Sequence, residues 1–334
     1  MTETPTPRNG SPFVVAIDIG GSWIKGALVG ADARPMAGER VATPDASEAE
    51  LVEAVAALVL GLAEEAQRRG TPAVAVGVST AGIIDESSGT ARGSANLRWR
   101  NTELGRHLEE LTGLPATLLQ DARAAAQAEA VLGAGRDADN FLMVVLGTGV
   151  GGAVVSDGRP LLGSHGLAGE IGHLQLDADG PLCGCGGRGC LEMVASGSAL
   201  SRRYAAATGS RLPAEAVLDL VVEGDPVATA LWSDAVSALA VALAAAVAVL
   251  DIELVIFGGG MAAAGPLLLD PLAKELATRV ALAPPPRLTV AALGNDAGLL
   301  GAAAAALRSV GHDQLVRSWQ SQPPSVAEAA ASTA

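Results

Sequence analysis

Apolar residues occur along the chain both in short runs bounded by glycine or polar residues and in longer stretches with helical spacing. Short apolar runs are typical of buried strands, and a spacing of three to four residues is typical of amphipathic helices. The short runs predict strands at residues 13–19, 24–29, 73–78, 117–120, 141–146, 153–156 and 254–257. The longer stretches predict helices at residues 48–69, 121–132, 235–250 and 297–306. Because strands and helices mix along the chain, the sequence predicts an α/β fold.

Two glycine-rich turns join predicted strands at comparable places in this pattern. Gly20-Gly21-Ser22 is the first, and residues 147–152 form the second. We therefore expect two similar βββαβα halves, with the two turns facing each other across a cleft. A third glycine turn, at residues 258–260, follows the predicted strand of the second half.

The composition narrows the class of protein. Hydrophobic residues make up 49% of the 334 positions and aromatic residues only 2%, so a large core must consist mainly of Ala, Val and Leu. The formal net charge of −14 disfavours nucleic acid or an anionic membrane as a partner. The first twelve residues lack the apolar run of a signal peptide, and the most apolar segment, residues 237–250, is shorter than a membrane span. We expect this segment to be a buried helix.

Every cysteine of the chain lies in one glycine-rich stretch, residues 172–192. Cys183, Cys185 and Cys190 follow His173, and three thiolates with one imidazole complete a tetrahedral ligand set for Zn²⁺. Such a set leaves no position for water, so the sequence predicts a structural zinc that braces a loop. Cysteines used in this way argue against disulfides and for a reducing cytoplasm.

The two hairpin turns have the composition of phosphate-binding loops. Glycine lets backbone N–H groups approach phosphate oxygens because no Cβ intervenes. In the first turn, D-I-G-G-S-W-I-K, Ser22 adds a hydroxyl donor, and Asp18 is placed to bind Mg²⁺ directly or through water. The chain contains no G-x-x-x-x-G-K-[ST] loop, and the first turn leads into a strand rather than into the helix of a dinucleotide-binding fold.

Polar residues on either side of the cysteine stretch suit a sugar ligand. Glu170 and Glu192 carry carboxylates, which accept hydrogen bonds from neighbouring hydroxyl groups. His173, with one ring nitrogen on zinc, keeps the other for a second partner. Asn96 can donate to and accept from the same ligand. Together these residues predict a polyol pocket.

Asp121 begins a predicted helix directly after a predicted strand. Asp is a favoured N-cap residue, because its carboxylate accepts a hydrogen bond from the first helical turn. It is also a general base, which accepts a hydroxyl proton during group transfer. The residue type leaves both interpretations open.

Seven segments occur in the order found in sugar kinases of the ROK family. They are D-I-G-G-S-W-I-K, N-L-R-W-R-N, Q-D-A-R-A-A-A-Q-A-E, L-G-T-G-V-G-G, G-L-A-G-E-I-G-H, C-G-C-G-G-R-G-C-L-E and F-G-G-G. The resemblance covers about residues 13–310. It implies the actin/hexokinase-like (ribonuclease H-like) fold, in which two α/β domains enclose a cleft with ATP and Mg²⁺ on one side and a hexose deep between them.

This resemblance implies a division into domains. We expect a small α/β domain at residues 13–121, completed by about 297–315, and a large α/β domain at 122–296 with the zinc loop at 173–192. Residues 1–12 and 320–334 are rich in Pro, Ser, Thr and Ala, and we expect them to be disordered.

Roles for individual residues follow from the same resemblance. It implies that Asp121 is the base that deprotonates the 6-hydroxyl group of the sugar. The substrate-binding positions are Gly82, Asn96, Gln120, Asp121, Glu170, His173 and Glu192. The positions for ATP and Mg²⁺ are Asp18, Gly20, Gly21, Ser22, Lys25, Gly147, Thr148 and Gly149, with Gly258, Gly259 and Gly260 on the adenosine side. The structural zinc ligands are His173, Cys183, Cys185 and Cys190.

Three residues depart from the pattern of the family. Gln120 stands where Asn is usual, and its extra methylene shifts or removes an amide contact to the sugar. Arg123 also stands where Asn is common, which puts a bulky cation near the base. Trp23 lies in the first phosphate turn, where a small or polar residue is common. These departures bear on the choice of sugar and on the catalytic rate.

The leading expectation is an ATP-dependent glucokinase, because N-L-R-W-R-N resembles bacterial glucokinases most. Kinases of N-acetylmannosamine or N-acetylglucosamine are the alternatives, and polyphosphate is an alternative donor. Gln120 and Arg123 leave a non-catalytic sugar sensor open. A transcriptional repressor of the same family is disfavoured, because no helix-turn-helix module precedes the first strand and the charge is acidic. The resemblance implies a homodimer or homotetramer.

Overall fold

The structure is a computed structural model that describes residues 12–45, 47–94 and 97–321. The described chain forms two compact units. The first unit holds the described residues up to Arg136, the segment Leu162–Leu167 and the described residues from Asn295 onward. The second unit holds Asp137–Leu161 and Ala168–Gly294. Each unit is therefore built from segments that are far apart in the sequence.

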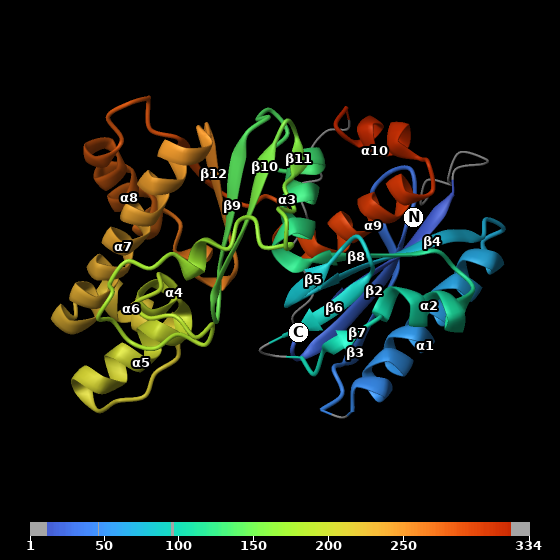
Figure 1. Ribbon diagram of the computed structural model, residues 1–334, viewed down its shortest axis with the longest axis horizontal. Coiled ribbons are helices and arrows are strands. Elements are labelled where there is room, and N and C mark those ends of the chain that lie inside the picture. The colour runs from blue at the N-terminus through green and yellow to red at the C-terminus, as the bar shows by residue number, and fades with distance from the viewer. Residues whose placement is uncertain (1–11, 46, 95–96, 322–334) are drawn as a thin grey trace, which may run out of the picture. The chain divides into compact units, whose positions relative to one another are not determined.

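A five-stranded sheet forms the centre of the first unit (Figure 1). Its strands are, in spatial order, β3 (Pro35–Ala42), β2 (Trp23–Val29), β1 (Phe13–Ile19), β4 (Ala73–Thr80) and β8 (Ala116–Gln120). β1 is antiparallel to β2 and parallel to β4, and β4 is parallel to β8. The carboxyl ends of β1, β4 and β8 therefore meet at one edge of the sheet.

Helices pack on both faces of this sheet, because β1 carries apolar side chains on both sides. The helices of the first unit are α1 (Glu48–Arg68), α2 (Leu104–Thr112), α3 (Asp121–Leu132), α9 (Ala297–Ser309) and α10 (Asp313–Trp319). Val15 and Ile17 pack in a core with α1 and α2, whereas Val14 and Ala16 pack in a core with α9 and with Trp319 of α10. A small sheet of β5 (Ile83–Asp85), β6 (Thr90–Gly93) and β7 (Arg100–Thr102) follows β4.

The second unit repeats the strand order of the first. Its strands are β11 (Arg159–Pro160), β10 (Val150–Ser156), β9 (Phe141–Leu146), β12 (Leu254–Gly258) and β13 (Arg287–Val290). Its helices are α4 (Glu192–Ala195), α5 (Gly197–Thr208), α6 (Ala214–Glu223), α7 (Pro226–Leu250) and α8 (Pro266–Arg279), with short 3₁₀ turns at Ile171–His173 and Gly260–Ala264. β9 is antiparallel to β10 and parallel to β12, as β1 is to β2 and β4. The expected duplication of the fold is confirmed.

The strands and helices predicted from the apolar pattern are present, with some changes of extent. The second glycine turn is shorter than residues 147–152, because β10 already begins at Val150. The predicted helix at 235–250 is the later part of α7, which begins at Pro226. The edge strand β3 was not predicted, because its exposed positions give it no apolar pattern.

The boundary between the units differs from the expected one at residue 121. α3 belongs to the first unit, where it lies against α9 (Figure 1). The contact is close because Gly301 of α9 has no side chain: a Cβ there would lie 1.9 Å from the carbonyl oxygen of Ala124 in α3. This packing of two distant segments has no local signal in the sequence.

α7 is, among the described residues, the one helix that is long and apolar enough to cross a membrane by length and composition. The expectation that this segment is too short is wrong, because the helix has 25 residues. Trp232, Leu239, Leu243 and Val247 of α7 are buried in the core of the second unit. A core helix can be as apolar as a membrane span, and the burial of these side chains accounts for part of the apolar sequence, since 39% of its apolar window is buried.

Gly301→Ala is expected to destabilise the protein by about 2–3 kcal/mol, because the new Cβ would force α3 and α9 apart. Gly61→Ala is the matched control, since Gly61 also lies inside a helix, α1, but its Cβ would meet nothing within 4 Å. The control is expected to stabilise the protein by about 0.5–1 kcal/mol. Urea unfolding of both variants measures the difference, and equal effects would contradict the packing argument.

Candidate functional site

The first glycine turn is a closed hairpin between β1 and β2. The backbone N–H of Gly20 donates to the carbonyl oxygen of Trp23 at 2.9 Å. Thr43 holds the turn from the side: its N–H donates to Ser22 O at 3.0 Å and its hydroxyl group donates to Gly20 O at 2.7 Å. The Trp23 ring stacks with Arg40 of β3, whose guanidinium carbon lies 3.9 Å from the ring centre. Trp23 is therefore engaged by the neighbouring strand.

Asp18 lies near the end of β1, directly before this turn. Burial raises the pKa of its carboxyl group, and the charge of Lys25 opposes that shift. A Cβ on Gly298 would lie 2.8 Å from Asp18 Oδ1, so the first turn of α9 comes this close only because Gly298 has no side chain. Lys25 Nζ donates to the carbonyl oxygen of Asn295 at 3.1 Å. A carboxylate oxygen is the kind of ligand that Mg²⁺ prefers, so this position fits a magnesium-linked role.

Gln120 and Asp121 lie where β8 ends and α3 begins. Gln120 is the N-cap, and its Oε1 accepts a hydrogen bond from the N–H of Arg123 at 3.0 Å. Asp121 is the first residue of the helix, is partly buried, and accepts a bond from Ala122 N–H at 2.8 Å through Oδ1. The N-cap interpretation of Asp121 is therefore wrong, because Gln120 takes that position.

The Arg123 side chain is buried and paired with Glu86, whereas the sequence predicted a bulky cation near Asp121. The side chain is 1% exposed, and its Nε donates to Glu86 Oε1 at 2.5 Å. Its Nη1 donates to the carbonyl oxygen of Gly166 at 2.9 Å. The guanidinium is thus bonded to Glu86, which directly follows β5, and to Gly166 in the segment Leu162–Leu167.

Gly82 lies between β4 and β5 in the left-handed region, with a φ of +126°. A Cβ there would lie 2.3 Å from the carbonyl oxygen of Gly93, so a side chain has no room. Gly82 lies just after the carboxyl end of β4, and Asp121 lies just after that of β8.

In the second unit, His173, Cys183, Cys185 and Cys190 form one cluster. Their ligand atoms all lie within 4.8 Å of one another, with 3.7 Å between Cys183 Sγ and His173 Nδ1 and 3.7 Å between Cys185 Sγ and Cys190 Sγ. Desolvation and the neighbouring thiols raise the pKa of Cys190 to about 12, so this sulfur needs a nearby cation to be a thiolate at neutral pH. The donor set fits a structural zinc ion.

Close backbone contacts fold the cysteine loop. Cys183 N–H donates to Gly187 O at 2.8 Å, and the loop carries two short β-bridges, Gln175 to Cys190 and Leu182 to Arg188. Gly189 has a φ of +59°, and a Cβ on it would lie 1.7 Å from the carbonyl oxygen of Asp177. These contacts explain why the stretch needs glycine between its ligands.

Glu192 connects the cysteine loop to the second glycine turn. Its Oε2 accepts a hydrogen bond from Val150 N–H at 2.9 Å, and its Oε1 lies 4.0 Å from Cys183 Sγ. A Cβ on Gly149 would lie 2.4 Å from Glu192 Oε2, so this approach requires glycine. The carboxylate therefore holds the start of β10 as well as facing the cluster.

The remaining predicted residues of the second unit lie in or next to turns. Gly147 O accepts from Gly197 N–H at 2.8 Å, and Thr148 O accepts from the Ser198 hydroxyl group at 2.6 Å, so the turn is fastened to the start of α5. Gly258 ends β12, Gly259 has a φ of +83°, and Gly260 begins the 3₁₀ turn. Glu170 directly precedes the turn that carries His173.

The predicted site residues divide between the two units. The first unit holds Asp18, Gly20, Gly21, Ser22, Lys25, Gly82, Gln120 and Asp121. The second unit holds Gly147, Thr148, Gly149, Glu170, His173, the three cysteines, Glu192, Gly258, Gly259 and Gly260. Asn96 lies outside the described residues. Sequence reasoning missed Glu86 and Gly298, because their significance comes from the distant Arg123 and Asp18.

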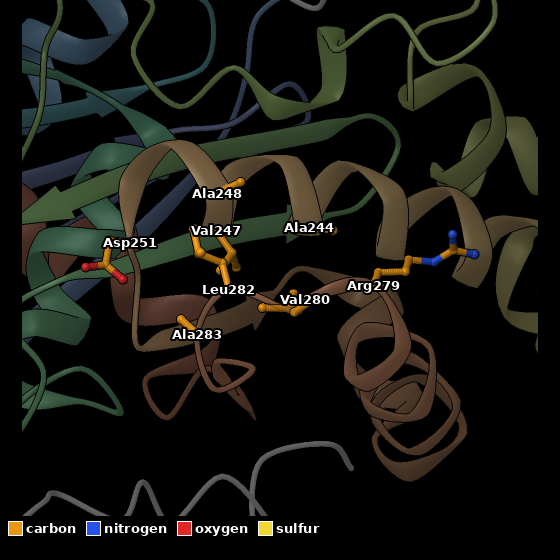
Figure 2. Close-up of a pocket in the computed structure, with 9 residues that line it drawn as sticks. Ala244, Val247, Ala248, Asp251, Arg279, Val280, Leu282 and Ala283 are labelled. Carbon is orange, nitrogen blue, oxygen red and sulfur yellow. The ribbon is translucent and has the colours of Figure 1, made fainter.

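A cavity of about 580 Å³ also lies in the second unit, between the end of α7 and the chain after α8 (Figure 2). Val247, Asp251, Arg279 and Leu282 are among the residues that line it. None of the predicted site residues is among its lining residues, so the cavity does not belong to either set.

Known proteins resemble the chain over most of its length. The model of the ROK family matches residues 14–309. An N-acetylmannosamine kinase of Escherichia fergusonii is 38% identical over 86% of this chain and 96% of its own length, and a glucokinase of Streptomyces coelicolor is 33% identical over 87% and 96%. A structure of an ROK family glucokinase from Streptomyces griseus, in complex with glucose and AMPPNP, is 33% identical, with a TM-score of 0.76 over 89% of this chain and 99% of that one. The chain belongs to the ROK family, as one of its sugar kinases.

Proposed function

We propose that the protein transfers the γ-phosphoryl group of ATP to the 6-hydroxyl group of a hexose, and that this hexose is glucose. The observation that carries the proposal is the common edge at which β1, β4 and β8 end, where Asp18, Gly82 and Asp121 lie in or next to these strand ends. Phosphoryl transfer needs a base for the acceptor hydroxyl group and a cation for the phosphates. A carboxylate for each role is available at this edge. The Streptomyces griseus glucokinase, with glucose and AMPPNP bound, supports the same pair of ligands.

Asp121 is the general base in this proposal. Its carboxylate accepts the proton of the 6-hydroxyl group while the oxygen forms a bond to the γ-phosphorus and the bond to the leaving ADP oxygen breaks. Asp18 would hold Mg²⁺ directly or through water, and the bound ion would supply charge neutralisation at the phosphates. Gly82 and Gln120 border the sugar on the same side as Asp121.

The other residues bind and orient the two substrates. The phosphates are bound by Gly20, Gly21, Ser22, Lys25, Gly147, Thr148 and Gly149, and the adenosine by Gly258, Gly259 and Gly260. The sugar hydroxyl groups are bound by Asn96, Glu170, His173 and Glu192. His173 and the three cysteines would hold the structural zinc ion, which would fix His173 as a ligand and Glu192 through its contact with Cys183.

N-acetylmannosamine is the second candidate substrate, favoured by the higher identity of 38% to the Escherichia fergusonii enzyme. N-acetylglucosamine remains an alternative of the same kind. A sugar sensor that binds without turnover is the alternative of another class. Gln120 and Arg123 are the two departures that favour a sensor, and Arg123 favours it less because its side chain pairs with Glu86.

The test is an ADP-release assay with purified protein, ATP and Mg²⁺, and with glucose, mannose, fructose, N-acetylglucosamine and N-acetylmannosamine as acceptors. Turnover that is fastest with glucose supports the proposal, and turnover confined to an N-acetylated sugar replaces the substrate. If no acceptor is phosphorylated, polyphosphate is used as donor in place of ATP. Sugar binding without turnover on either donor would indicate a sensor.

Asp18→Asn is expected to raise the melting temperature at pH 7 by a few degrees while the protein loses activity with Mg²⁺ and ATP. Because burial holds the folded-state pKa of Asp18 above its ordinary value of 3.8, the folded protein loses stability as the pH rises through this raised pKa. The amide has no such charge, so the gain should disappear near pH 3. Thermal unfolding at pH 7 and at pH 3 measures the effect, and a lower melting temperature at pH 7 would contradict it.

We further propose a cytoplasmic homodimer or homotetramer that binds neither nucleic acid nor membrane. The acidic net charge of −14 and the clustering of all cysteines at one reduced site support this. Light scattering of the purified protein measures the number of chains.

A further inference from the structure

Arg123 and Glu86 form a buried ion pair at the start of α3. The side chains are 1% and 15% exposed, and the Nε–Oε1 distance is 2.5 Å. Removing two charges from water is costly, and an apolar pair of similar volume is often as stable or more stable. The free energy of folding therefore gives little reason for a charged pair rather than an apolar one. The groups that the two side chains bond give a better reason.

One oxygen of Glu86 binds two residues that flank Asp121 in the sequence. Glu86 Oε1 accepts from Arg123 Nε at 2.5 Å and from the backbone N–H of Gln120 at 3.2 Å. Gln120 Oε1 in turn accepts from Arg123 N–H at 3.0 Å. Gln120 and Arg123, which precede and follow Asp121 in the chain, are thus bonded to each other and to Glu86. These bonds restrict the backbone that carries the Asp121 carboxylate.

The other end of the guanidinium holds a separate segment. Arg123 Nη1 donates to Gly166 O at 2.9 Å, and Nη2 lies 3.5 Å from Ile84 O. Gly166 belongs to Leu162–Leu167, which is part of the first unit although the chain on both sides of it is part of the second. Gly166 also packs closely on β5, because a Cβ there would lie 2.8 Å from Ile84 O. Glu170 follows four residues later.

We propose that Arg123 is a positioning residue, which fixes the Asp121 carboxylate for catalysis and anchors the segment Leu162–Leu167 that leads to Glu170. The planar guanidinium serves a carboxylate and two carbonyl groups at once, whereas a lysine ammonium has no such fork. The catalytic part of this inference rests on the proposed kinase function, and the anchoring part does not.

The kinetic test uses the double variant Arg123→Met/Glu86→Met, which removes both charges and keeps apolar volume. Its melting temperature is expected to stay within a few degrees of that of the wild type, while kcat falls about 100-fold, because a small displacement of a catalytic group costs this much. KM for the sugar should change less than kcat. Arg308→Met/Asp313→Met removes another ion pair of the first unit and is the matched control, with kcat unchanged. A folded double variant with wild-type kcat would overturn the proposal.

Arg123→Lys provides a variant that keeps the charge opposite Glu86 and is expected to fold. Its kcat should fall at least tenfold, because the Lys ammonium lacks the planar fork that bonds Glu86 and Gly166 O at the same time. Full activity of Arg123→Lys would overturn the role of the guanidinium fork.

Hydrogen exchange tests the anchoring without any turnover. In the double variant, the backbone amides of residues 162–167 should exchange at least tenfold faster, while those of β1 and β4 remain as protected as in the wild type. Unchanged exchange in 162–167 would overturn the anchoring. If the wild type phosphorylates none of the sugars, the kinase proposal fails, and the exchange result still decides whether Arg123 anchors this segment.

Discussion

Asp121→Asn is expected to lower kcat for sugar phosphorylation by about 10³-fold or more and to leave the affinity for the sugar nearly unchanged. The amide cannot accept the hydroxyl proton, but its oxygen still accepts the hydrogen bond from Ala122 N–H that Asp121 Oδ1 accepts at 2.8 Å. Gln120 remains the N-cap, so the helix keeps its start. The measurement is kcat by ADP release, with sugar affinity by calorimetry.

Asp313→Asn is the matched control for this variant. Asp313 is also the first residue of a helix in the first unit, α10, and its carboxylate pairs with Arg308 and Arg317 at the surface. Its replacement should cost at most about 1 kcal/mol of stability and leave kcat unchanged. Retained turnover in Asp121→Asn would refute Asp121 as the base, and a similar loss in Asp313→Asn would show that the effect is not specific to the site.

Cys185→Ser is expected to reduce the bound zinc well below one ion per chain and to lower the melting temperature. If the lost metal contributes about 4 kcal/mol, the melting temperature of a chain of 334 residues should fall by about 6 °C. KM for the sugar should rise more than kcat falls, because the cluster holds the loop that carries His173 and Glu192, and Asp121 lies in the other unit. Elemental analysis, thermal unfolding and steady-state kinetics measure the three effects.

His165→Gln is the control for the loss of a ligand. His165 is exposed and lies outside the cluster of His173 and the three cysteines. This variant should keep its zinc and its melting temperature. Wild-type zinc content in Cys185→Ser would contradict the assignment of the cluster, and chelation that lowers the stability of Cys185→Ser as much as that of the wild type would do the same.

Local sequence patterns predicted the fold well where one segment carries the whole signal. β9 is a continuous apolar run and β1 is one except for Asp18, because strands covered by helices on both faces bury nearly all of their side chains. The glycine turns after them identified both hairpins and so the duplication. Elements without such a signal were missed, as the exposed edge strand β3 shows.

Some residues of the candidate site could also be identified from local sequence, and others could not. The zinc ligands could be identified because all four lie within eighteen residues, and a short loop can bring them together. The N-cap at α3 could not be assigned, because Gln120 and Asp121 are neighbours and only the backbone conformation decides which one caps the helix. Glu86 could not be found, because nothing near it in the sequence indicates a partner at residue 123.

Local patterns and motifs were enough to predict the α/β class, the duplicated hairpins, the cysteine and histidine cluster and the membership of the ROK family, since each depends on residues close together or on motifs in a fixed order. Three other features became visible only in the folded chain: α3 belongs to the first unit, α9 approaches Asp18 because Gly298 has no side chain, and Arg123 is buried against Glu86 and Gly166. These features depend on close approach between distant segments. Packing geometry and the pairing of buried charges fix such contacts, and neither leaves a periodic pattern in the sequence.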